Sequence, residues 1–366
     1  MAPRLVIVHP SLLTYRRDFF DRVAQGYHGE MRVYFSPTDM GALSHVNATP
    51  HWAEPIGPIR SIMPGAEWQE GAVSVPLNRG DIVVISGAPR CLSNLVLLLR
   101  ARLKGATIVW WGHYRTATST PLLMTVRLTI ALSAHALLFY TDAEVEEYHA
   151  QTKWPHRCPV HALNNGIDTG PIQSRRAVYA PASRERAVLF IGRLTEKTGL
   201  RTAIEALSRP AAAGISMHVI GDGAARAALI AFAEERGLAD RIHWHGDTTD
   251  EDRIATVANR CRAFIYPGDV GLSLIHAMSY GLPAVLHDNP KLQMPEYAAF
   301  SDDVTGRSFP HGNSEALAQV LGRTIDDFGT LSSFSTKALD KTETDYTTRG
   351  MATRMLALIE KLEAVR

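Results

Sequence analysis

Short, almost continuously apolar runs alternate along this chain with longer segments whose apolar residues recur at helical spacing. In the first half the runs are RLVIVHP, DIVVISG and ATIVWWGH, and in the second half they are AVLFIGRL, MHVIGDG, AFIYPG and PAVLHDN. Strands that are apolar on both faces are typical of a parallel sheet covered by helices on its two sides. The alternation therefore predicts an α/β fold of doubly wound parallel sheets.

The chain is long enough for two such sheets. Its 366 residues exceed one ordinary domain of about 150 residues, and between Val160 and Arg186 the alternation gives way to an irregular, hinge-like segment. We expect a Rossmann-like domain over residues 1–170, a second over 171–345, and a C-terminal helix over 346–366 that packs back on the first domain. Ligands of doubly wound domains bind at the carboxyl ends of the strands, so we expect a ligand in a cleft between the two.

The composition limits the expected binding partners and cellular compartment of the protein. A formal net charge of +1 does not suggest the strongly basic face of a nucleic-acid-binding protein. Cys91, Cys158 and Cys261 are too far apart for a C-x-x-C zinc site or a disulfide framework. The longest apolar stretch, Leu128 to Tyr140, is shorter than the roughly 18 residues of a spanning helix, and the N-terminal run is too short for a signal peptide. We therefore expect a cytoplasmic protein that binds no nucleic acid; its oligomeric state is left open.

Two cations follow one strand of the second half. In IGRLTEKTGL, Arg193 and Lys197 lie in the loop between a predicted strand and a predicted helix, next to Gly192. A guanidinium offers a planar pair of donors for phosphate oxygens and an ammonium offers a point charge, so the two together suit a diphosphate. The alternative is that both are solvated charges on an exposed loop.

A second anion-binding element is predicted in PGDVGLSLIHAMSYGLPAV, residues 267–285. A short strand ends at Pro267, a turn containing glycine follows, and a helix begins at about Leu272. The backbone amides of Gly271, Leu272 and Ser273 stand at the start of this helix, where unpaired N–H groups and the helix dipole favour anions. With the two cations of the preceding motif, they predict a diphosphate site in the second domain.

These motifs occur together in the order and spacing of a known family. Asn165-Gly166-Ile167-Asp168 is followed by FIGRLTEKTGL, VIGDG, IHWHG, GLSLIHAMSYGLPAV, Pro295-Glu296 and VTGRSF, over about residues 165 to 320. In this order they resemble the retaining family-4 glycosyltransferases of the GT-B fold. The first half is less distinctive, although LLTYRRDFF, GAPR and WWGH are similar to the corresponding positions of bacterial polysaccharide-type members. The resemblance implies a GT-B fold, with two Rossmann-like domains facing across a cleft.

The resemblance also implies roles for individual residues. The second domain would bind a UDP- or GDP-linked sugar donor, with His245 near the base, and the first domain would bind the acceptor. The implied catalytic residues are Arg193, Lys197 and His113. The implied donor-binding residues are Gly192, His245, Asp269, Gly271, Leu272, Ser273 and His276, and the implied acceptor-binding residues are Tyr15, Arg16 and Arg17, in the first loop. His113 either reaches the donor sugar or packs in the core.

The chain departs from the family at two places. Gly268 and His276 replace the glutamates of the E-x7-E pattern, which in the family touch the donor sugar and the ribose, and Thr198 stands where many members have the diphosphate lysine. Gly268 leaves room at the sugar. An imidazole at 276 can still hydrogen-bond a ribose hydroxyl; the alternative is a histidine satisfied within the core. Asp269 either supplies a carboxylate to the sugar or is an acid stabilised at a helix start.

The function implied is transfer of a sugar from a nucleotide-diphosphate donor to a saccharide or lipid-linked acceptor, with retention, in bacterial cell-surface polysaccharide or glycoconjugate synthesis. No convincing H-E-x-x-H, D-x-D or EF-hand pattern is found, so we expect no metal and no cofactor, and electrostatic stabilisation of the leaving group by the protein itself. A lipid-linked acceptor would bring the protein to the inner face of the membrane. Two alternatives remain: a nucleotide-sugar epimerase on the same fold, and a non-catalytic nucleotide-sugar-binding protein.

Overall fold

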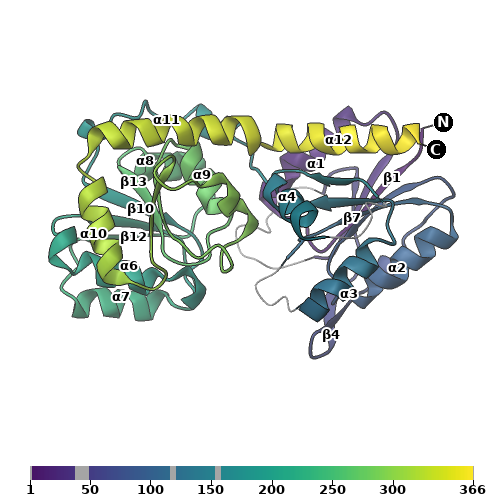
Figure 1. Cartoon of the computed structure of the whole chain (residues 1–366), viewed down its shortest axis with the longest axis horizontal. Helices are drawn as coiled ribbons and strands as arrows, with labels where there is room; N and C mark the ends of the chain where they lie inside the picture. The colour runs from purple at the N-terminus through teal and green to yellow at the C-terminus, as the bar shows by residue number, and fades with distance from the viewer. Residues whose placement is uncertain (1, 38–48, 116–120, 153–157, 366) are drawn as a thin grey trace. The chain divides into compact units, whose positions relative to one another are not determined.

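The chain divides into two compact units, which are described one at a time. In this computed structural model, residues 2–37, 49–115, 121–152 and 158–365 are described. Unit 1 contains Met1–Asn164 and Thr348–Arg366, and unit 2 contains Asn165–Thr347. The sequence had led us to place these divisions at residues 170 and 345. Figure 1 shows the helices and strands of both units.

Unit 1 is built on a parallel sheet with seven strands in the described residues, in the order β3-β2-β1-β6-β7-β8-β9. The strands are β1 (Leu5–His9), β2 (Met31–Phe35), β3 (Ala53–Pro55), β6 (Ile82–Ser86), β7 (Thr107–Trp111), β8 (Ala136–Phe139) and β9 (Val160–Ala162). The helices are α1 (Thr14–Gly26), α2 (Leu92–Leu103), α3 (Pro121–Ala131), α4 (Asp142–Gln151) and α12 (Thr348–Ala364), with a 3-10 turn η1 (Ala72–Ser74).

The strands of unit 1 are covered on both faces. Leu5 and Ile7 of β1 belong to a core shared with α1 and α12, whereas Val6 and Val8 belong to a second core shared with α2. Successive side chains of a strand point to opposite faces, so two apolar cores require the almost continuous apolar runs that the sequence shows. The predicted doubly wound parallel sheet is confirmed for this unit.

Unit 2 repeats the architecture with a parallel sheet of six strands in the order β12-β11-β10-β13-β14-β15. The strands are β10 (Ala187–Ile191), β11 (Ser216–Ile220), β12 (Ile242–Gly246), β13 (Ala263–Tyr266), β14 (Ala284–His287) and β15 (Gly306–Phe309). The helices are α5 (Gly170–Gln173), α6 (Leu200–Leu207), α7 (Arg226–Glu235), α8 (Glu251–Ala258), α9 (Leu272–Ser279), α10 (Ser314–Thr324) and α11 (Phe328–Asp345). Short 3-10 turns are η2 (Pro181–Ser183), η3 (Glu196–Thr198), η4 (Pro210–Ala212) and η5 (Pro295–Ala299).

An antiparallel pair in unit 1 was not predicted. Strands β4 (Ile59–Met63) and β5 (Ala66–Gln69) pair around Gly65, which has a φ of +79°. Every residue of β4 is exposed. A strand that buries neither face lacks the apolar pattern from which the other strands were predicted.

Candidate functional site

The strand order of unit 2 reverses beside β10. From β10 the chain first adds β11 and β12 on one side of the sheet, and then β13, β14 and β15 on the other. The carboxyl ends of β10 and β13 therefore flank the topological switch point, which is where open α/β sheets bind ligands. Arg193 and Lys197 follow β10, and the loop that leads into α9 follows β13. The two predicted phosphate-binding motifs thus meet at the switch point of this sheet.

Both cations at this point are exposed and have no acidic partner. Arg193 follows Gly192 directly after β10, and Lys197 lies in η3. Within the described residues neither side chain forms an ion pair or a side-chain hydrogen bond, although unit 2 has many such pairs elsewhere. The positive charge of Arg193 is felt by Tyr266 at the end of β13, and that of Lys197 by Asp269. Arg193 and Lys197 therefore lie beside the end of β13 and the loop that follows it, where the charge of Lys197 also interacts with the carboxyl of Asp269.

The loop after β10 is packed directly on the loop after β13. The backbone N–H of Asp269 donates to the carbonyl of Lys197 at 3.2 Å. A Cβ added to Gly268 would collide with that carbonyl and would lie 2.8 Å from the Cα of Thr198. Glycine at 268 is therefore required for the close approach of the two loops, a physical reason other than the room at the sugar that the sequence suggested.

Helix α9 begins at Leu272 with Gly271 as its N-cap, and no side chain caps it. There is no acidic residue in its first turn. The first N–H groups of a helix have no partner within it and carry the positive end of its dipole. Gly271, Leu272 and Ser273 are only partly buried, so their amides are accessible to an anion. The helix start that the sequence predicts near Leu272 is present, and the structure adds that no side chain caps it.

Two hydrogen bonds fix the loop before α9 and the segment that leads through η5. The side-chain carbonyl of Gln293 accepts from the backbone N–H of Val270 at 2.8 Å. Glu296 of η5 is only 5% exposed and accepts a hydrogen bond from the side chain of Asn165. The first bond ties the loop to the segment between β14 and η5, and the second ties η5 to the start of unit 2. Glu296 therefore has a structural contact within unit 2.

Asp269 is the acidic residue of the loop. Burial raises the pKa of its carboxyl above the ordinary value, and the positive charges of Lys197 and His311 partly oppose this. The side chain is half-buried and has no hydrogen bond within the described residues. It therefore stands beside the cationic loop without neutralising it through a direct ion pair.

His276, on α9, is held by a carboxylate from another helix. Its Nε2 lies 2.9 Å from Oε1 of Glu251, the first residue of α8. The same oxygen accepts a hydrogen bond from the hydroxyl of Tyr280. Sequence reasoning missed Glu251 and Tyr280, because nothing in the spacing of residues 25 positions apart shows that α8 and α9 meet. The one local signal was the i, i+4 spacing of His276 and Tyr280, which puts them on one helix face.

His245, near the end of β12, belongs to a chain of polar side chains. Its Nε2 lies 2.9 Å from Nδ1 of His218 on β11, and Nε2 of His218 lies 3.3 Å from Glu185. His218 is only 2% exposed. Burial lowers its pKa to about 4, although Glu185 opposes the shift, so His218 is neutral near pH 7. His245 is thus oriented by a buried neutral histidine.

The predicted residues of unit 1 are distributed between packing and surface contacts. His113 follows β7, stacks on Tyr140 with ring centroids 4.3 Å apart, and has its Nδ1 3.6 Å from Glu144. Tyr15, Arg16 and Arg17 lie in the first turn of α1 and not in a loop.

Of these three, Arg16 is buried. It is 5% exposed and lies between Tyr15 and Trp111, with its guanidinium carbon 5.3 and 5.8 Å from the two ring centroids. Arg17 forms an i, i+4 ion pair with Asp21 at 3.5 Å. Each of these cations therefore already has a structural contact in unit 1.

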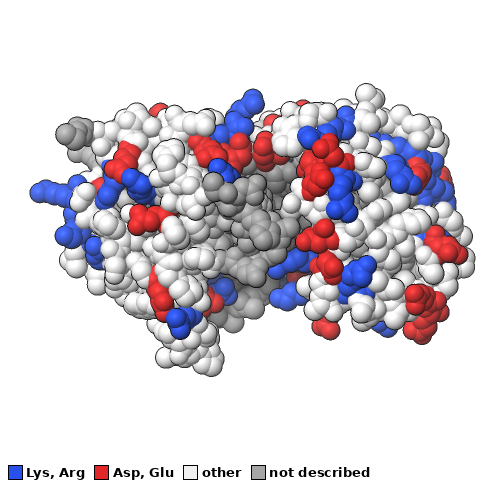
Figure 2. Space-filling model, turned by 180° about the vertical axis from the view of Figure 1, so that it is seen from behind, with Lys and Arg blue, Asp and Glu red and all other residues white. Residues whose placement is uncertain are grey.

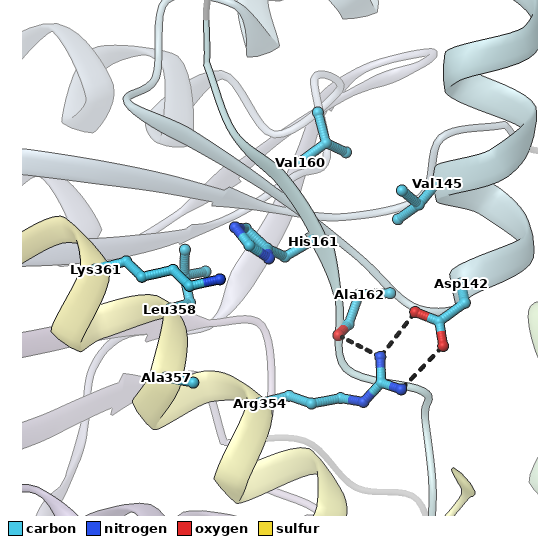
Figure 3. A pocket seen from close by; sticks show the side chains of 9 residues that line it. All are labelled: Asp142, Val145, Val160, His161, Ala162, Arg354, Ala357, Leu358 and Lys361. Carbon is cyan, nitrogen blue, oxygen red and sulfur yellow. Dashed lines mark hydrogen bonds and ion pairs between the residues drawn. The ribbon is translucent and has the colours of Figure 1, made fainter.

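A separate cavity of about 260 Å³ lies within unit 1 between α4, β9 and α12. It is lined by Asp142, Val145, Val160, His161, Ala162, Arg354, Ala357, Leu358 and Lys361 (Figure 3). Arg354 bonds both carboxylate oxygens of Asp142 at 2.7 and 3.0 Å and donates to the carbonyl of Ala162. No predicted site residue lines this cavity. The guanidinium of Arg354 already bonds α12 to α4 and β9.

Charge and hydropathy of the described parts limit other kinds of site. On the face shown in Figure 2, acidic and basic side chains are interspersed rather than gathered into one basic surface. In the described ranges there is no group of three or more His, Cys, Asp or Glu side chains placed to hold a metal ion. No helix in those ranges has the length and apolar character needed to cross a bilayer.

Part of the chain is similar in sequence to known glycosyltransferases. Residues 172–340 match the family described as glycosyl transferases group 1. The 2-deoxystreptamine glucosyltransferase of Streptomyces kanamyceticus is 28% identical over 191 residues, which are 45% of this chain and 47% of that protein. The amylovoran biosynthesis glycosyltransferase of Erwinia amylovora is 28% identical over 231 residues, 57% of this chain and 54% of that protein. The chain spans about half the length of these curated relatives.

Solved structures resemble the whole chain at low sequence identity. A glycosyltransferase from Rickettsia africae superimposes with a TM-score of 0.72 and 14% identity, covering 98% of each chain. Anabaena HepE in complex with UDP and glucose gives a TM-score of 0.71 and 14% identity, covering 98% of this chain and 100% of that one. The two doubly wound units and these structural neighbours show that the chain has the GT-B fold. Residues 172–340, which match the family described as glycosyl transferases group 1, lie in unit 2.

Proposed function

We propose that the chain is a glycosyltransferase that takes a sugar from a nucleotide-diphosphate donor bound by unit 2. The observation that carries this proposal is the meeting of Arg193, Lys197 and the uncapped start of α9 at the switch point of the sheet. Two exposed cations without acidic partners, beside free helix-start amides, form a place for a group with two negative charges. The match of residues 172–340 to glycosyl transferases group 1 and the bacterial polysaccharide relatives support a sugar nucleotide as that group.

In this proposal the protein contributes orientation and charge stabilisation. Transfer forms a bond from the acceptor hydroxyl oxygen to the anomeric carbon and breaks the bond between that carbon and the terminal phosphate oxygen, on which negative charge develops. Arg193, Lys197 and the amides of Gly271, Leu272 and Ser273 are placed to stabilise that charge without reorganising, which is the form of catalysis expected of fixed dipoles and cations. With retention, the departing phosphate oxygen takes the proton of the acceptor hydroxyl on the same face of the sugar. Neither metal nor cofactor is assigned a part.

The acceptor is proposed to be a saccharide or a lipid-linked saccharide, bound by unit 1. The relatives that act in amylovoran and colanic acid biosynthesis support a bacterial cell-surface polysaccharide. A lipid-linked acceptor would bring the protein to the inner face of the membrane by peripheral contact. UDP is the first donor nucleotide to test, because a solved neighbour holds UDP and glucose.

The central test is the loss of Arg193. Arg193→Ala should weaken binding of UDP or GDP, whichever the protein binds, by about 1.5 to 3 kcal/mol, the range for hydrogen bonds to charged groups. Isothermal titration calorimetry measures this directly. Arg323→Ala is a matched control, because Arg323 is an exposed arginine on α10 with no ion pair in the described residues. Equal nucleotide affinities of the two variants would remove Arg193 from the site.

Product analysis separates the alternatives. When the protein is incubated with a panel of nucleotide sugars and saccharide acceptors, transfer or donor hydrolysis supports a glycosyltransferase. Formation of an epimeric nucleotide sugar would instead indicate an epimerase, and binding without turnover a non-catalytic protein. Activity that persists unchanged in excess EDTA is expected, since the proposal gives charge stabilisation to protein groups alone.

A further inference from the structure

Helix α2 of unit 1 is apolar on the side that faces away from its sheet. The residues of its inner side are buried in the core of the unit: Leu97, Leu98 and Ala101. On the opposite side Val96, Leu99 and Leu103 are 41%, 58% and 81% exposed. A surface helix usually carries polar residues on its outer side, and a helix that is apolar all round is usually covered on all sides. The described residues contain nothing that covers the outer side of α2.

More exposed apolar side chains lie on the neighbours of α2. They are Ile59, Ile62 and Met63 of β4 and Val126 of α3. The strand β5 that pairs with β4 contacts α2, and the backbone N–H of Glu67 in β5 donates to the carbonyl of Arg90, just before α2. Arg102 of α2 donates to the carbonyl of Ser133, just after α3. Figure 1 shows the three elements on one side of unit 1. We call their exposed apolar side chains the apolar surface of unit 1.

The chain around α2 carries positive charge and no negative charge. Residues 82–141 contain six Lys or Arg and no Asp or Glu. Arg102 and Lys104 are exposed at the C-terminal end of α2, and the exposed Arg79 packs beside Gly105. Within the described residues none of these three cations forms an ion pair. The acid nearest to them in the sequence, Asp81, pairs with Arg4 at 2.8 Å. The apolar surface therefore ends at a group of unpaired positive charges.

A membrane that contains anionic lipids matches both features. The apolar side of a peripheral helix enters the boundary between headgroups and acyl chains, and cations beside it are attracted to anionic headgroups. A second copy of this chain would match only the apolar part, because the same surface offers no carboxylate to the cations. The glutamates of the neighbouring hairpin, Glu67 and Glu70, already pair with Arg90 and Arg60.

We propose that unit 1 docks on membranes containing anionic lipids through its apolar surface, with Leu99 and Leu103 among the headgroups and Arg102 and Lys104 beside the lipid phosphates. Because Val96, Leu99 and Leu103 run along about two turns of one side of the helix, α2 lies parallel to the membrane. The inference rests on the proposed function, in which the acceptor is a lipid-linked saccharide. It adds the face of the protein that meets the membrane.

Binding to vesicles tests the docking. Wild-type protein should bind vesicles of two parts phosphatidylcholine and one part phosphatidylglycerol, and it should bind phosphatidylcholine alone more than about tenfold more weakly, because the charge attraction is absent. Leu103→Glu puts a carboxylate into the apolar surface and should weaken binding to the anionic vesicles by about tenfold or more. The matched control is Val178→Glu, which makes the same change of charge at a 91% exposed apolar residue of unit 2. It should bind like the wild type.

The cations are tested in the same assay. Each basic residue near an anionic membrane strengthens binding by a factor of about five, so Arg79→Gln combined with Lys104→Gln should bind about 25-fold more weakly. Arg323→Gln combined with Lys337→Gln is the control, because these exposed cations of α10 and α11 have no ion pair in the described residues. It removes the same charge from unit 2 and should leave vesicle binding near the wild-type value.

The outcomes separate this inference from the proposed function. If wild-type protein does not bind the anionic vesicles, or if Leu103→Glu binds them as well as Val178→Glu does, the inference is overturned. Size-exclusion chromatography with light scattering identifies the alternative occupant: a wild-type dimer that Leu103→Glu makes monomeric would mean that a second copy covers α2, and it would overturn the inference. Nucleotide calorimetry, which uses no membrane, tests the proposed function by itself. Leu103→Glu should keep the wild-type affinity for UDP or GDP.

Discussion

At the scale of single residues, His287 shows how a buried imidazole makes stability depend on pH. Its side chain, at the end of β14, is fully buried, and Nδ1 accepts from the backbone N–H of Asn289 at 3.2 Å. Burial, with a smaller contribution from the charge of His311, lowers the pKa of His287 to about 4. The ordinary value near 6.5 applies in the unfolded chain. The folded state therefore resists protonation that the unfolded state accepts.

This difference predicts a loss of stability in weak acid. Above pH 6.5 the contribution of His287 is constant, and it is lost as the pH falls from about 6.5 toward 4, because only the unfolded state gains the proton. Between pH 7 and pH 5 the loss from this one group is about 2 kcal/mol. His287→Asn retains an acceptor for the Asn289 amide but cannot titrate, so its free energy of unfolding should fall by about 2 kcal/mol less over that interval. Urea unfolding of both proteins at pH 7 and pH 5 measures this difference. If both lose the same free energy of unfolding, the pH dependence does not come from His287.

The sequence predicted the positions of residues at strand ends better than their contacts. Arg193 and Lys197 were placed after a strand from local pattern alone, and they lie there. The partner of His276 was not predicted, because Glu251 comes from another helix and only the tertiary fold brings the two side chains together. Arg16 was predicted to face an acceptor, whereas it is buried beside Trp111. The sequence of a helical segment does not show which neighbours a charged side chain will contact in the folded protein.

At the scale of elements, the two loops at the switch point depend on glycine at position 268. The carbonyl of Lys197 occupies the place where a Cβ would stand, and it also accepts from Asp269. Gly268→Ala should therefore separate the loops and lower the free energy of unfolding by about 2 kcal/mol, a typical cost of overpacking. Gly268→Glu, which restores the family's first glutamate, should cost more and should not improve nucleotide binding.

Chemical denaturation of these variants measures the effect. Gly329→Ala is the control, because a Cβ at this position in the first turn of α11 meets only Asp327 Oδ1, at 3.9 Å. It should be neutral or slightly stabilising, since alanine favours a helix more than glycine does. A Gly268→Ala protein as stable as Gly329→Ala would show that the two loops are not packed as described.

Elements with a strong local pattern were the ones that the sequence predicted well. Helix α9 was expected from about Leu272 and begins there, because its apolar residues follow a helical period and glycines bound it. The exposed strand β4 has no such pattern and was missed. The fold at the site could be predicted because buried, parallel strands impose a long apolar signature, whereas contacts between helices leave none.

At the scale of the whole molecule, the C-terminal helix completes the core of the first unit. Helix α12 packs along α1, and Met351, Met355, Leu358 and Ile359 are almost fully buried in the core that they share with β1. Thr348 donates to Asp18, and Arg354 pairs with Asp142. Unit 1 is therefore made from two segments separated by the whole of unit 2, so its stability depends on residues more than 180 positions from the rest of its core.

The division into units predicts that core damage stays local. Met355→Ala removes a fully buried side chain from unit 1 and should destabilise it by about 2 to 5 kcal/mol. Met278→Ala makes the same change at a fully buried position of α9, in unit 2. Hydrogen exchange followed by mass spectrometry should show faster exchange in α1 and β1 for the first variant, and in β13 and β14 for the second. Equal acceleration of exchange in both units for either variant would mean that the two cores unfold together. The packing of α12 in unit 1 would then contribute to the stability of the whole chain as one cooperative structure.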